Sequence, residues 1–424
     1  MRRYKTYKDS GIAWIGDIPS HWNICRVKSL FFHISGNGFK IMYQGKQSGK
    51  YPFCKASDIN GDQMFVSSAA NYVDDEVAAS EGYNIIPQNS ILFSKIGEAL
   101  KKNHRKINTI PCIVDNNCSA LANHSNENII YYYYVMKNID MIWFDNAGVI
   151  PCVNIKKLMC CGLPLPPLAE QEAIVAFLDK KTSEIDDLVA QVEREIELLK
   201  EYKQAEIAKV VTKGLDPNVP MKPSGISWIG DIPAHWDVQK INQNFTERRE
   251  KVSDKDFEPL SVTKEGVLPQ LETAAKTNNG DNRKKVCKGD FVVNSRSDRK
   301  GSCGFSYYDG SVSLINTVLV PRSNIFGRYY HYVFRSNDFI EEFYRLGRGI
   351  VADLWTTRYT EQRNIMIPVP PLEEQQMMVD FIDHRTASID RLMVELTYQV
   401  EYLKEYKQRL IADVVTGKIN VQPN

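Results

Sequence analysis

The amino-acid sequence repeats itself, and this repeat constrains the fold more than any other feature. Residues 10–22 read SGIAWIGDIPSHW and residues 224–236 read SGISWIGDIPAHW, with 11 identities in 13 positions. Residues 164–213 and 368–417 share 25 identities in 50 positions. Chance does not produce such matches in a chain of 424 residues, so each half of the chain is one copy of a duplicated unit.

Two variable stretches, residues 23–163 and 237–367, separate the repeated segments. They align poorly, although YYYYVMK (131–137) resembles YYHYVFR (329–335) in its position within the repeat. We interpret the stretches as two versions of one fold with diverged surfaces; unrelated inserts between duplicated segments are the alternative. Apolar runs bounded by turn residues predict mixed α/β domains. The predicted strands are Ile91–Phe93, Ile129–Val135, Phe291–Val293, Val312–Leu314 and Thr317–Val320.

A segment that follows each variable stretch is predicted to form one long helix. No Pro or Gly occurs from Leu168 to Lys213 or from Leu372 to Thr416, and good helix formers dominate both segments. Pro167 and Pro371 suit the first turn of a helix. A break is predicted near Asp179–Ser183, where Thr and Ser can cap a new helix. Unbroken, each helix would be about 60–70 Å long.

Apolar residues recur every seven positions along both helical segments, with companions three residues later, which predicts a coiled-coil-like seam. Because a helix with such a stripe needs a partner in water, its own copy is the simplest one. Two similar halves tend to pack with pseudo-twofold symmetry, so we expect antiparallel helices with the variable domains at the two ends. Packing of each helix on its own domain is the alternative. The predicted seam comprises Leu178, Ile185, Leu188, Val192, Leu199, Tyr202, Ile382, Ile389, Leu392, Leu396, Leu403 and Tyr406.

Four of the six tryptophans lie in the repeated motif, at Trp14, Trp22, Trp228 and Trp236. The Gly-Asp-Ile-Pro that precedes Trp22 and Trp236 is typical of a turn. We interpret these tryptophans as core anchors; a patch that binds a protein partner is the alternative.

Charge is distributed unevenly along the chain. The net charge is +1, yet residues 168–213 and 372–417 each carry −4, which leaves +9 on the remainder. Lys and Arg neutralise phosphates, and Arg also recognises guanine edges, so basic clusters in the variable stretches are candidate DNA-binding sites. A solvated basic surface is the alternative. The candidates are Lys101, Lys102, Arg105, Lys106, Arg283, Lys284, Lys285, Arg296, Arg299, Lys300, Arg345 and Arg348.

Signatures of catalysis are missing from the sequence. There is no phosphate-binding P-loop, no Gly-rich nucleotide fingerprint, and no Asn/Asp-Pro-Pro-aromatic tetrad of an amino-methyltransferase. The nine cysteines and seven histidines do not fall at metal-binding spacing, and no apolar run reaches the length of a membrane helix. We therefore expect a non-catalytic, cytoplasmic protein with reduced thiols and no bound metal or cofactor. A protein scaffold and a nuclease with dispersed carboxylates stay open as alternatives.

In this arrangement the chain resembles the DNA-specificity (S) subunits of type I restriction-modification systems. The resemblance covers nearly the whole chain. Its most specific carriers are the duplicated G-D-I-P-x-H-W at 16–22 and 230–236 and the duplicated P-P-L-x-E-Q at 166–171 and 370–375. Each helical segment also ends in L-K-E-Y-K-Q.

The resemblance implies an α+β protein with two target recognition domains, residues 1–165 and 214–369. It also implies two spacer helices, residues 166–213 and 370–424, the second with a C-terminal tail. In the family, each domain reads one half of a split double-stranded DNA target, and the paired helices set the spacer between the halves. Two methylation subunits dock along the shared regions, and restriction subunits join that core. These partners are expected to carry the chemistry of S-adenosylmethionine, ATP and Mg²⁺.

Overall fold

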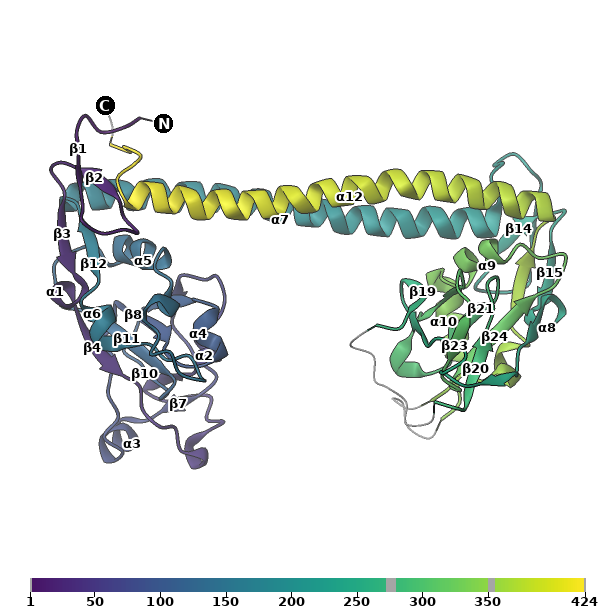
Figure 1. The fold of residues 1–424 in the computed structure, drawn as a ribbon, viewed down its shortest axis with the longest axis horizontal. Helices are drawn as coiled ribbons and strands as arrows, with labels where there is room; N and C mark the ends of the chain where they lie inside the picture. Colours follow the sequence, from purple (N-terminus) through teal and green to yellow (C-terminus); the bar gives the residue numbers. More distant parts are fainter. Residues whose placement is uncertain (1, 272–279, 350–354, 423–424) are drawn as a thin grey trace. The chain divides into compact units, whose positions relative to one another are not determined.

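The computed structural model describes residues 2–271, 280–349 and 355–422. The chain divides into two compact units, one formed by Met1–Gln191 with Gln399–Asn424 and the other by Val192–Tyr398. Each unit contains one β-rich head, the first part of one long helix and the last part of the other (Figure 1).

The head of the first unit is built on a five-stranded sheet in the order β4-β11-β8-β9-β6. Its central strand β8 is buried at all five positions, as expected of a strand covered on both faces. A three-stranded sheet, β10-β5-β7, and two pairs, β1-β2 and β3-β12, complete the head. The strands are β1 (Tyr7–Asp9), β2 (Asp17–Pro19), β3 (Asn23–Arg26), β4 (Phe31–Ser35), β5 (Tyr51–Cys54), β6 (Phe65–Val66), β7 (Tyr72–Val73), β8 (Ser90–Ser94), β9 (Arg105–Asn108), β10 (Ile113–Val114), β11 (Cys118–Asn123) and β12 (Gly162–Leu165). The helices are α1 (Val27–Leu30), η1 (Ile41–Tyr43), α2 (Ala56–Ile59), α3 (Asp75–Ser80), α4 (Glu98–Lys101), α5 (Ile129–Lys137), η2 (Met141–Phe144) and α6 (Ile155–Met159).

The head of the second unit has the same strand order in its main sheet. Its order β16-β24-β21-β22 corresponds to β4-β11-β8-β9, and the pairs β13-β14 and β15-β25 correspond to β1-β2 and β3-β12. The strands are β13 (Met221–Pro223), β14 (Asp231–Pro233), β15 (Asp237–Lys240), β16 (Phe245–Glu247), β17 (Lys251–Val252), β18 (Leu260–Thr263), β19 (Gly266–Pro269), β20 (Arg283–Val286), β21 (Phe291–Asn294), β22 (Cys303–Phe305), β23 (Gly310–Val312), β24 (Asn316–Pro321) and β25 (Met366–Val369). The helices are α8 (Ile241–Asn244), η3 (Ser297–Arg299), α9 (Gly327–Val333), α10 (Asn337–Arg345) and α11 (Tyr359–Gln362).

Three of the five predicted strands lie in strands of the structure: Ile91–Phe93 in β8, Phe291–Val293 in β21 and Thr317–Val320 in β24. Only the first residue of Val312–Leu314 belongs to a strand, β23.

The prediction of a strand at Ile129–Val135 is wrong, because this run forms helix α5. The side chain of Asn128 caps it by accepting hydrogen bonds from the backbone N–H groups of Ile130 (3.0 Å) and Tyr131 (3.2 Å). Burial on every side, from Tyr131 to Met136, hides the helical period that a one-sided helix would show. The related run in the second head likewise forms a helix, α9.

The two long helices are α7 (Leu168–Lys213, 46 residues) and α12 (Leu372–Val415, 44 residues). The predicted break near Asp179–Ser183 does not occur. Thr182 caps no new helix there, because its side chain is buried and its hydroxyl lies 3.5 Å from the hydroxyl of Tyr134 in the head. At 1.5 Å per residue, each helix is about 65–70 Å long.

The predicted seam consists of two lines of residues, and these lines differ in burial. The residues at the seven-residue repeat are buried or half-buried: Leu178, Ile185, Val192, Leu199, Ile382, Ile389, Leu396 and Leu403. The companions placed three residues later are exposed, and this part of the prediction is wrong: Leu188, Tyr202, Leu392 and Tyr406. The second buried line falls four residues after the first, at positions such as Thr182, Val189 and Val400, which keeps the alternating three- and four-residue spacing of a heptad.

The repeated motifs meet where the first head joins the helices. Glu170, in the first turn of α7, accepts hydrogen bonds from Trp22 Nε1 and from the Tyr4 hydroxyl, both at 3.0 Å, and lies 2.6 Å from His21 Nε2. Gly417, just after α12, packs on Trp22 with a φ of +75°, where a Cβ would lie 3.0 Å from the ring. Both the positive φ and the lack of space call for glycine at this position.

The second unit repeats this junction. Glu374 accepts a hydrogen bond from Trp236 Nε1 (2.9 Å) and lies 2.7 Å from His235 Nε2, while Gly214 packs on the Trp236 ring just after α7. Trp22 and Trp236 are fully buried, which confirms their interpretation as core anchors. In each unit, therefore, the head contacts the start of one long helix and the end of the other.

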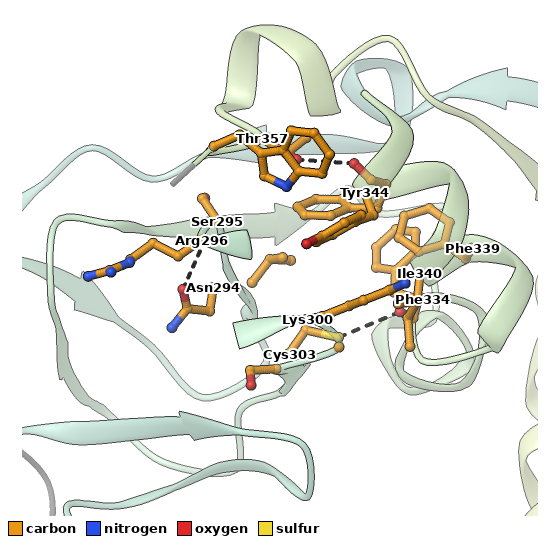
Figure 2. A pocket seen from close by; sticks show the side chains of 15 residues that line it. Asn294, Ser295, Arg296, Lys300, Cys303, Phe334, Phe339, Ile340, Tyr344 and Thr357 are labelled. Atoms are coloured by element: carbon orange, nitrogen blue, oxygen red, sulfur yellow. Dashed lines mark hydrogen bonds between the residues drawn. The ribbon is translucent and has the colours of Figure 1, made fainter. Parts of the chain in front are cut away.

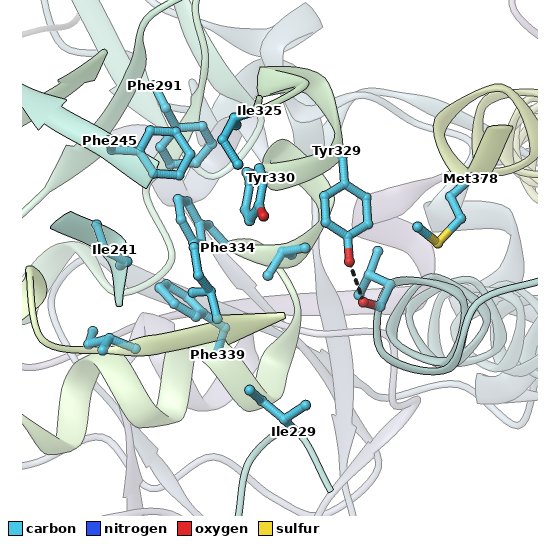
Figure 3. Close-up of a cluster of buried hydrophobic side chains, with 14 of the residues drawn as sticks. Ile229, Ile241, Phe245, Phe291, Ile325, Tyr329, Tyr330, Phe334, Phe339 and Met378 are labelled. Carbon is cyan, nitrogen blue, oxygen red and sulfur yellow. Dashed lines mark hydrogen bonds between the residues drawn. The ribbon is translucent and has the colours of Figure 1, made fainter. Parts of the chain in front are cut away.

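The core of the second unit continues from the head into the long helices (Figure 3). Phe245, Phe291 and Phe334 pack together between the main sheet and α9. Tyr329 reaches the other way, and its hydroxyl donates a hydrogen bond of 2.7 Å to the backbone oxygen of Val211 in α7. The first unit has the same contact, from the Tyr131 hydroxyl to the end of α12.

Candidate DNA-binding surfaces

Exposed cations of the second unit gather beyond the end of strand β21. Arg296 forms a β-bridge with Thr356, and Thr356 forms another with Arg348. Arg345, at the end of α10, lines one hollow together with Arg348. Lys300 lies against the same helix, with Nζ 4.6 Å from the ring centroid of Tyr344. The fold thus brings together candidates from two sequence clusters.

These cations are paired with carboxylates at the surface of the second unit. Exposed pairs of this kind contribute only about 0–1 kcal/mol, so exchange of carboxylate for phosphate costs little. Arg299 lies 3.8 Å from a carboxylate and is two-thirds exposed. The other pairs are Arg296 with Asp298 (3.0 Å), Lys300 with Glu341 (2.6 Å), Arg345 with Glu342 (2.7 Å) and Arg348 with Glu361 (4.0 Å).

The cluster at Arg283–Lys285 is not the free basic loop that the sequence predicted. Arg283 is buried in strand β20, where its guanidinium donates to the side chain and to the backbone oxygen of Ser311 at 2.8 and 3.0 Å. Lys284 is mostly covered and donates to the backbone oxygen of Asn316 (2.8 Å). Lys285 pairs with Glu250 at 2.9 Å. Arg283 and Lys284 are therefore engaged inside the fold, because a cation in an internal strand must satisfy its donors there.

A small pocket lies beside the exposed cluster (Figure 2). Figure 2 shows the Arg296 side chain directed away from the pocket and Lys300 lying across it, with Phe334, Phe339 and Tyr344 on the far side. The cavity has a volume of about 20 Å³, enough for a single water. The cavity is too small for an unstacked base.

In the first unit the basic run at 101–106 divides into exposed and buried halves. Lys101 and Lys102 are exposed at the end of α4, with Lys101 paired to Glu98 (2.6 Å). Arg105 and Lys106 begin strand β9 and are buried, which removes them from the candidate surface.

The buried pair is held by acceptors both near and far in the sequence. Arg105 donates to the backbone oxygen of Ile139 and to the side-chain and backbone oxygens of Asn103, and Lys106 donates to the backbone oxygen of Asp58 (3.0 Å). Burial lowers the pKa of Arg105 to about 10, so the side chain keeps its charge at neutral pH.

A loop that sequence reasoning missed lies beside Lys101 and Lys102. Helix α4 packs against η2, and the backbone N–H of Gly97 donates to Pro151 O (2.9 Å) at the end of the loop that follows η2. Val149 is fully exposed and Ile150 largely so. Exposed apolar tips beside cations suit a DNA groove, where they can contact thymine methyl groups. The sequence feature that could have revealed this loop is the short apolar run Ala-Gly-Val-Ile (147–150), which belongs to no predicted element.

Over residues 2–271, 280–349 and 355–422, no group of three or more His, Cys, Asp or Glu side chains is placed to hold a metal ion. Within the same ranges, no helix is both long and apolar enough to cross a bilayer.

Taken together, the fold and the surfaces define a class of protein. Its two heads share the strand order of their main sheets and are attached to long helices by the same contacts, and each head exposes cations suited to a polyanion. Comparisons with known proteins agree on a family. Residues 19–198 match the family described as the type I restriction modification DNA specificity domain.

Two curated relatives from Methanocaldococcus jannaschii match along nearly their whole length. The putative type I restriction enzyme MjaX specificity subunit is 26% identical over 96% of both chains. The type I restriction enzyme MjaVIII specificity subunit is 23% identical over 96% of this chain and 94% of the relative. One chain of a solved structure shares the fold. That structure is described with the words "structural basis underlying complex assembly and conformational transition of the type I R-M system". The match has a TM-score of 0.65 at 13% identity and covers 95% of this chain and 99% of that one. The chain is therefore similar, over nearly its whole length, to type I restriction-modification specificity subunits.

Proposed function

We propose that the protein reads a bipartite double-stranded DNA target, with each head reading one half. The observation that carries this proposal is the shared strand order of the two heads beneath different surfaces. Equal scaffolds place their loops equivalently, and different loops then recognise different bases. In the second head the candidate surface is the exposed group Arg296, Arg299, Lys300, Arg345 and Arg348. In the first head it is Lys101 and Lys102 with the apolar loop beside them.

The long helices are proposed to form an antiparallel coiled coil that sets the spacer between the half-targets. Within the first unit, Asp186 of α7 pairs with Lys407 of α12 at 2.6 Å. Within the second unit, Lys203 of α7 pairs with Asp390 of α12, also at 2.6 Å. Higher numbers on one helix meet lower numbers on the other, which supports antiparallel pairing. The exchange of the same residue types between the repeats supports a pseudo-twofold relation.

Exposed apolar side chains on the helices are proposed to receive two methylation subunits, to which restriction subunits are added. So many exposed apolar side chains are unusual on the outer face of a helix and are typical of interfaces. Those partners would carry the S-adenosylmethionine, ATP and Mg²⁺ chemistry, and this chain would stay non-catalytic. The exposed residues include Leu188, Leu198, Tyr202, Leu392, Val394, Tyr398, Tyr402 and Tyr406.

Methylation mapping tests the proposal. The chain would be produced with its methylation subunits in cells that lack other modification systems, and all modified bases would be sequenced. We expect every modified site to contain two fixed half-targets with a constant spacer. A matched chain with the exposed cations of one head replaced should lose modification altogether, because both halves are needed for binding. Modification without any sequence preference would favour a scaffold, and Mg²⁺-dependent cutting by the chain alone would favour a nuclease.

A further inference from the structure

A groove of about 600 Å³ lies in the second unit, between its head and its helix segments. The walls come from α7, α12, α9, α10 and two loops of the head. The groove is more than ten times larger than needed for an ordered water. Its charged lining residues are Lys203, Lys264, Lys300, Arg335, Glu341 and Asp390.

Two of these four cations are not matched by a carboxylate. Asp390 pairs with Lys203, and Glu341 pairs with Lys300. Lys264 is exposed and makes no ion pair with any residue that the structure describes. Among the residues that the structure describes, the guanidinium of Arg335 donates to backbone oxygens of the loop at Lys264 and Glu265 and contacts His331. The groove therefore carries an excess of positive charge.

The pKa of the neighbouring His331 is affected by the same positive charge. His331 lines the groove and is largely buried, and this burial, with Arg335 and Arg328 nearby, lowers the pKa of its imidazole to about 3 against the opposing effect of Asp383. It is neutral at physiological pH and offers no extra charge. The carboxylate of Glu265 interacts electrostatically with Arg335 and Lys264, but within the described residues it forms no ion pair with either.

The first unit builds a related cluster from the equivalent residues. Lys407 of α12 pairs with Asp186 of α7, as Lys203 pairs with Asp390 in the second unit. Lys137 of α5 stands at the position that Arg335 holds in the related run of the second head.

Lys137 is the unmatched cation of this cluster. Its Nζ lies 5.6 Å from the ring centroid of Tyr133, and it forms no ion pair within the described part of the chain. Burial, with the charge of Lys407 nearby, lowers the pKa of Lys137. A buried cation without a partner costs free energy, which a bound anion would offset. Because both units contain such a cation, a chance feature of one loop does not explain it.

We propose that the junction of head and helices in each unit binds backbone phosphates of the DNA spacer, next to the half-target. The binding residues are Lys203, Lys264 and Arg335 in the second unit and Lys137 and Lys407 in the first. The inference rests on the proposed function: where a head reads a half-target and the helices span the spacer, the phosphates at the boundary pass this junction. Contacts of this kind add affinity without reading sequence, as a spacer of arbitrary sequence requires.

The salt dependence of DNA binding tests the junction. The variants Lys264→Gln and Lys137→Gln each remove one charge that has no carboxylate partner, so neither leaves an unpaired acid behind. Lys200→Gln is the matched control, because Lys200 is on α7 near the groove, pairs with Glu197 and does not line the groove. With the methylation subunits present, each junction variant should lower the slope of log K against log salt by about 0.9, the value for one phosphate contact, while the control keeps the wild-type slope.

Neutral linkages in the DNA locate the contact. A target duplex with methylphosphonates at the spacer end of one half-target should bind the wild-type complex more weakly, and the junction variant of that side should show no further loss. Variants with the wild-type slope and the wild-type sensitivity to methylphosphonates would overturn the inference. A wild-type complex that does not prefer its target over a scrambled duplex would instead overturn the proposed function, so the two failures are distinguishable. Melting temperatures of all variants guard against a folding defect.

Discussion

Arg283 is buried and Arg348 is exposed, so their alanine variants are expected to lose different properties. Arg283→Ala leaves the side chain and backbone oxygen of Ser311 without their donor, which costs about 1–3 kcal/mol for each unsatisfied group. The melting temperature should fall, and DNA binding should weaken only as the fold is lost. Arg348→Ala removes a side chain that is 85% exposed, so stability should change by less than about 0.5 kcal/mol while the salt slope of binding drops.

Thermal melting and binding titrations at several salt concentrations separate these outcomes. If Arg348→Ala melted as early as Arg283→Ala, or bound DNA with an unchanged salt slope, Arg348 would not belong to the DNA surface.

His331 should make the second unit sensitive to mild acid. Its folded pKa of about 3 lies below the unfolded value of about 6.5, so the unfolded chain takes up a proton first. Stability is fully present above pH 6.5 and is lost as the pH falls toward 3; between pH 7.5 and 5.5 the loss is about 1.4 kcal/mol. Position 331 corresponds to Tyr133 in the other head, so His331→Tyr is the matched variant. Urea unfolding at both pH values should show the loss in the wild type and less of it in the variant. An equal loss in both would exclude His331 as its source.

Along the helices, neighbouring residues lie on opposite sides of the seam. Val189 is buried in the second line of the seam, and Leu188 beside it is nearly half exposed. Val189→Asp places a charge in that seam and should destabilise the first unit by several kcal/mol. Leu188→Asp should leave the melting temperature unchanged but weaken binding of the methylation subunits, for which the exposed stripe is the proposed site. Calorimetric melting and co-purification with those subunits measure the two effects. Equal melting temperatures of the two variants would contradict the seam described above.

The seam also shows what a sequence period can and cannot predict. A seven-residue repeat identifies one buried line, and Leu178, Ile185 and Val192 lie on it. The second line can fall three or four residues later, and both choices are apolar where Leu188 and Val189 stand side by side. Only the contact with a partner decides between them. Helix α5 is a similar case, because burial on all sides removes the pattern by which its helical state could have been recognised.

For the candidate DNA surface, local sequence predicted the charge but not its accessibility. Arg105 is buried because a backbone oxygen 34 residues away, that of Ile139, and the oxygens of Asn103 accept its hydrogen bonds. No spacing rule contains that information. The gathering of Arg296 and Arg348 depends likewise on β-bridges to Thr356, which join segments distant in the chain. The sequence therefore showed the resemblance and the duplication, whereas the DNA surface depends on tertiary contacts.

For the whole molecule, the duplication predicts that target and spacer can be changed independently. Seven residues inserted into α7 between Glu193 and Leu199, and seven into α12 between Thr397 and Leu403, preserve the heptad and lengthen each helix by about 10 Å. At 3.4 Å per base pair, the spacer should grow by about three base pairs while both half-targets stay the same. Sequencing of modified sites with the methylation subunits present measures the result. The matched control inserts the same residues into α7 alone, which mismatches the helices and should lower stability. Altered half-targets with an unchanged spacer would show that the helices do not set the spacing.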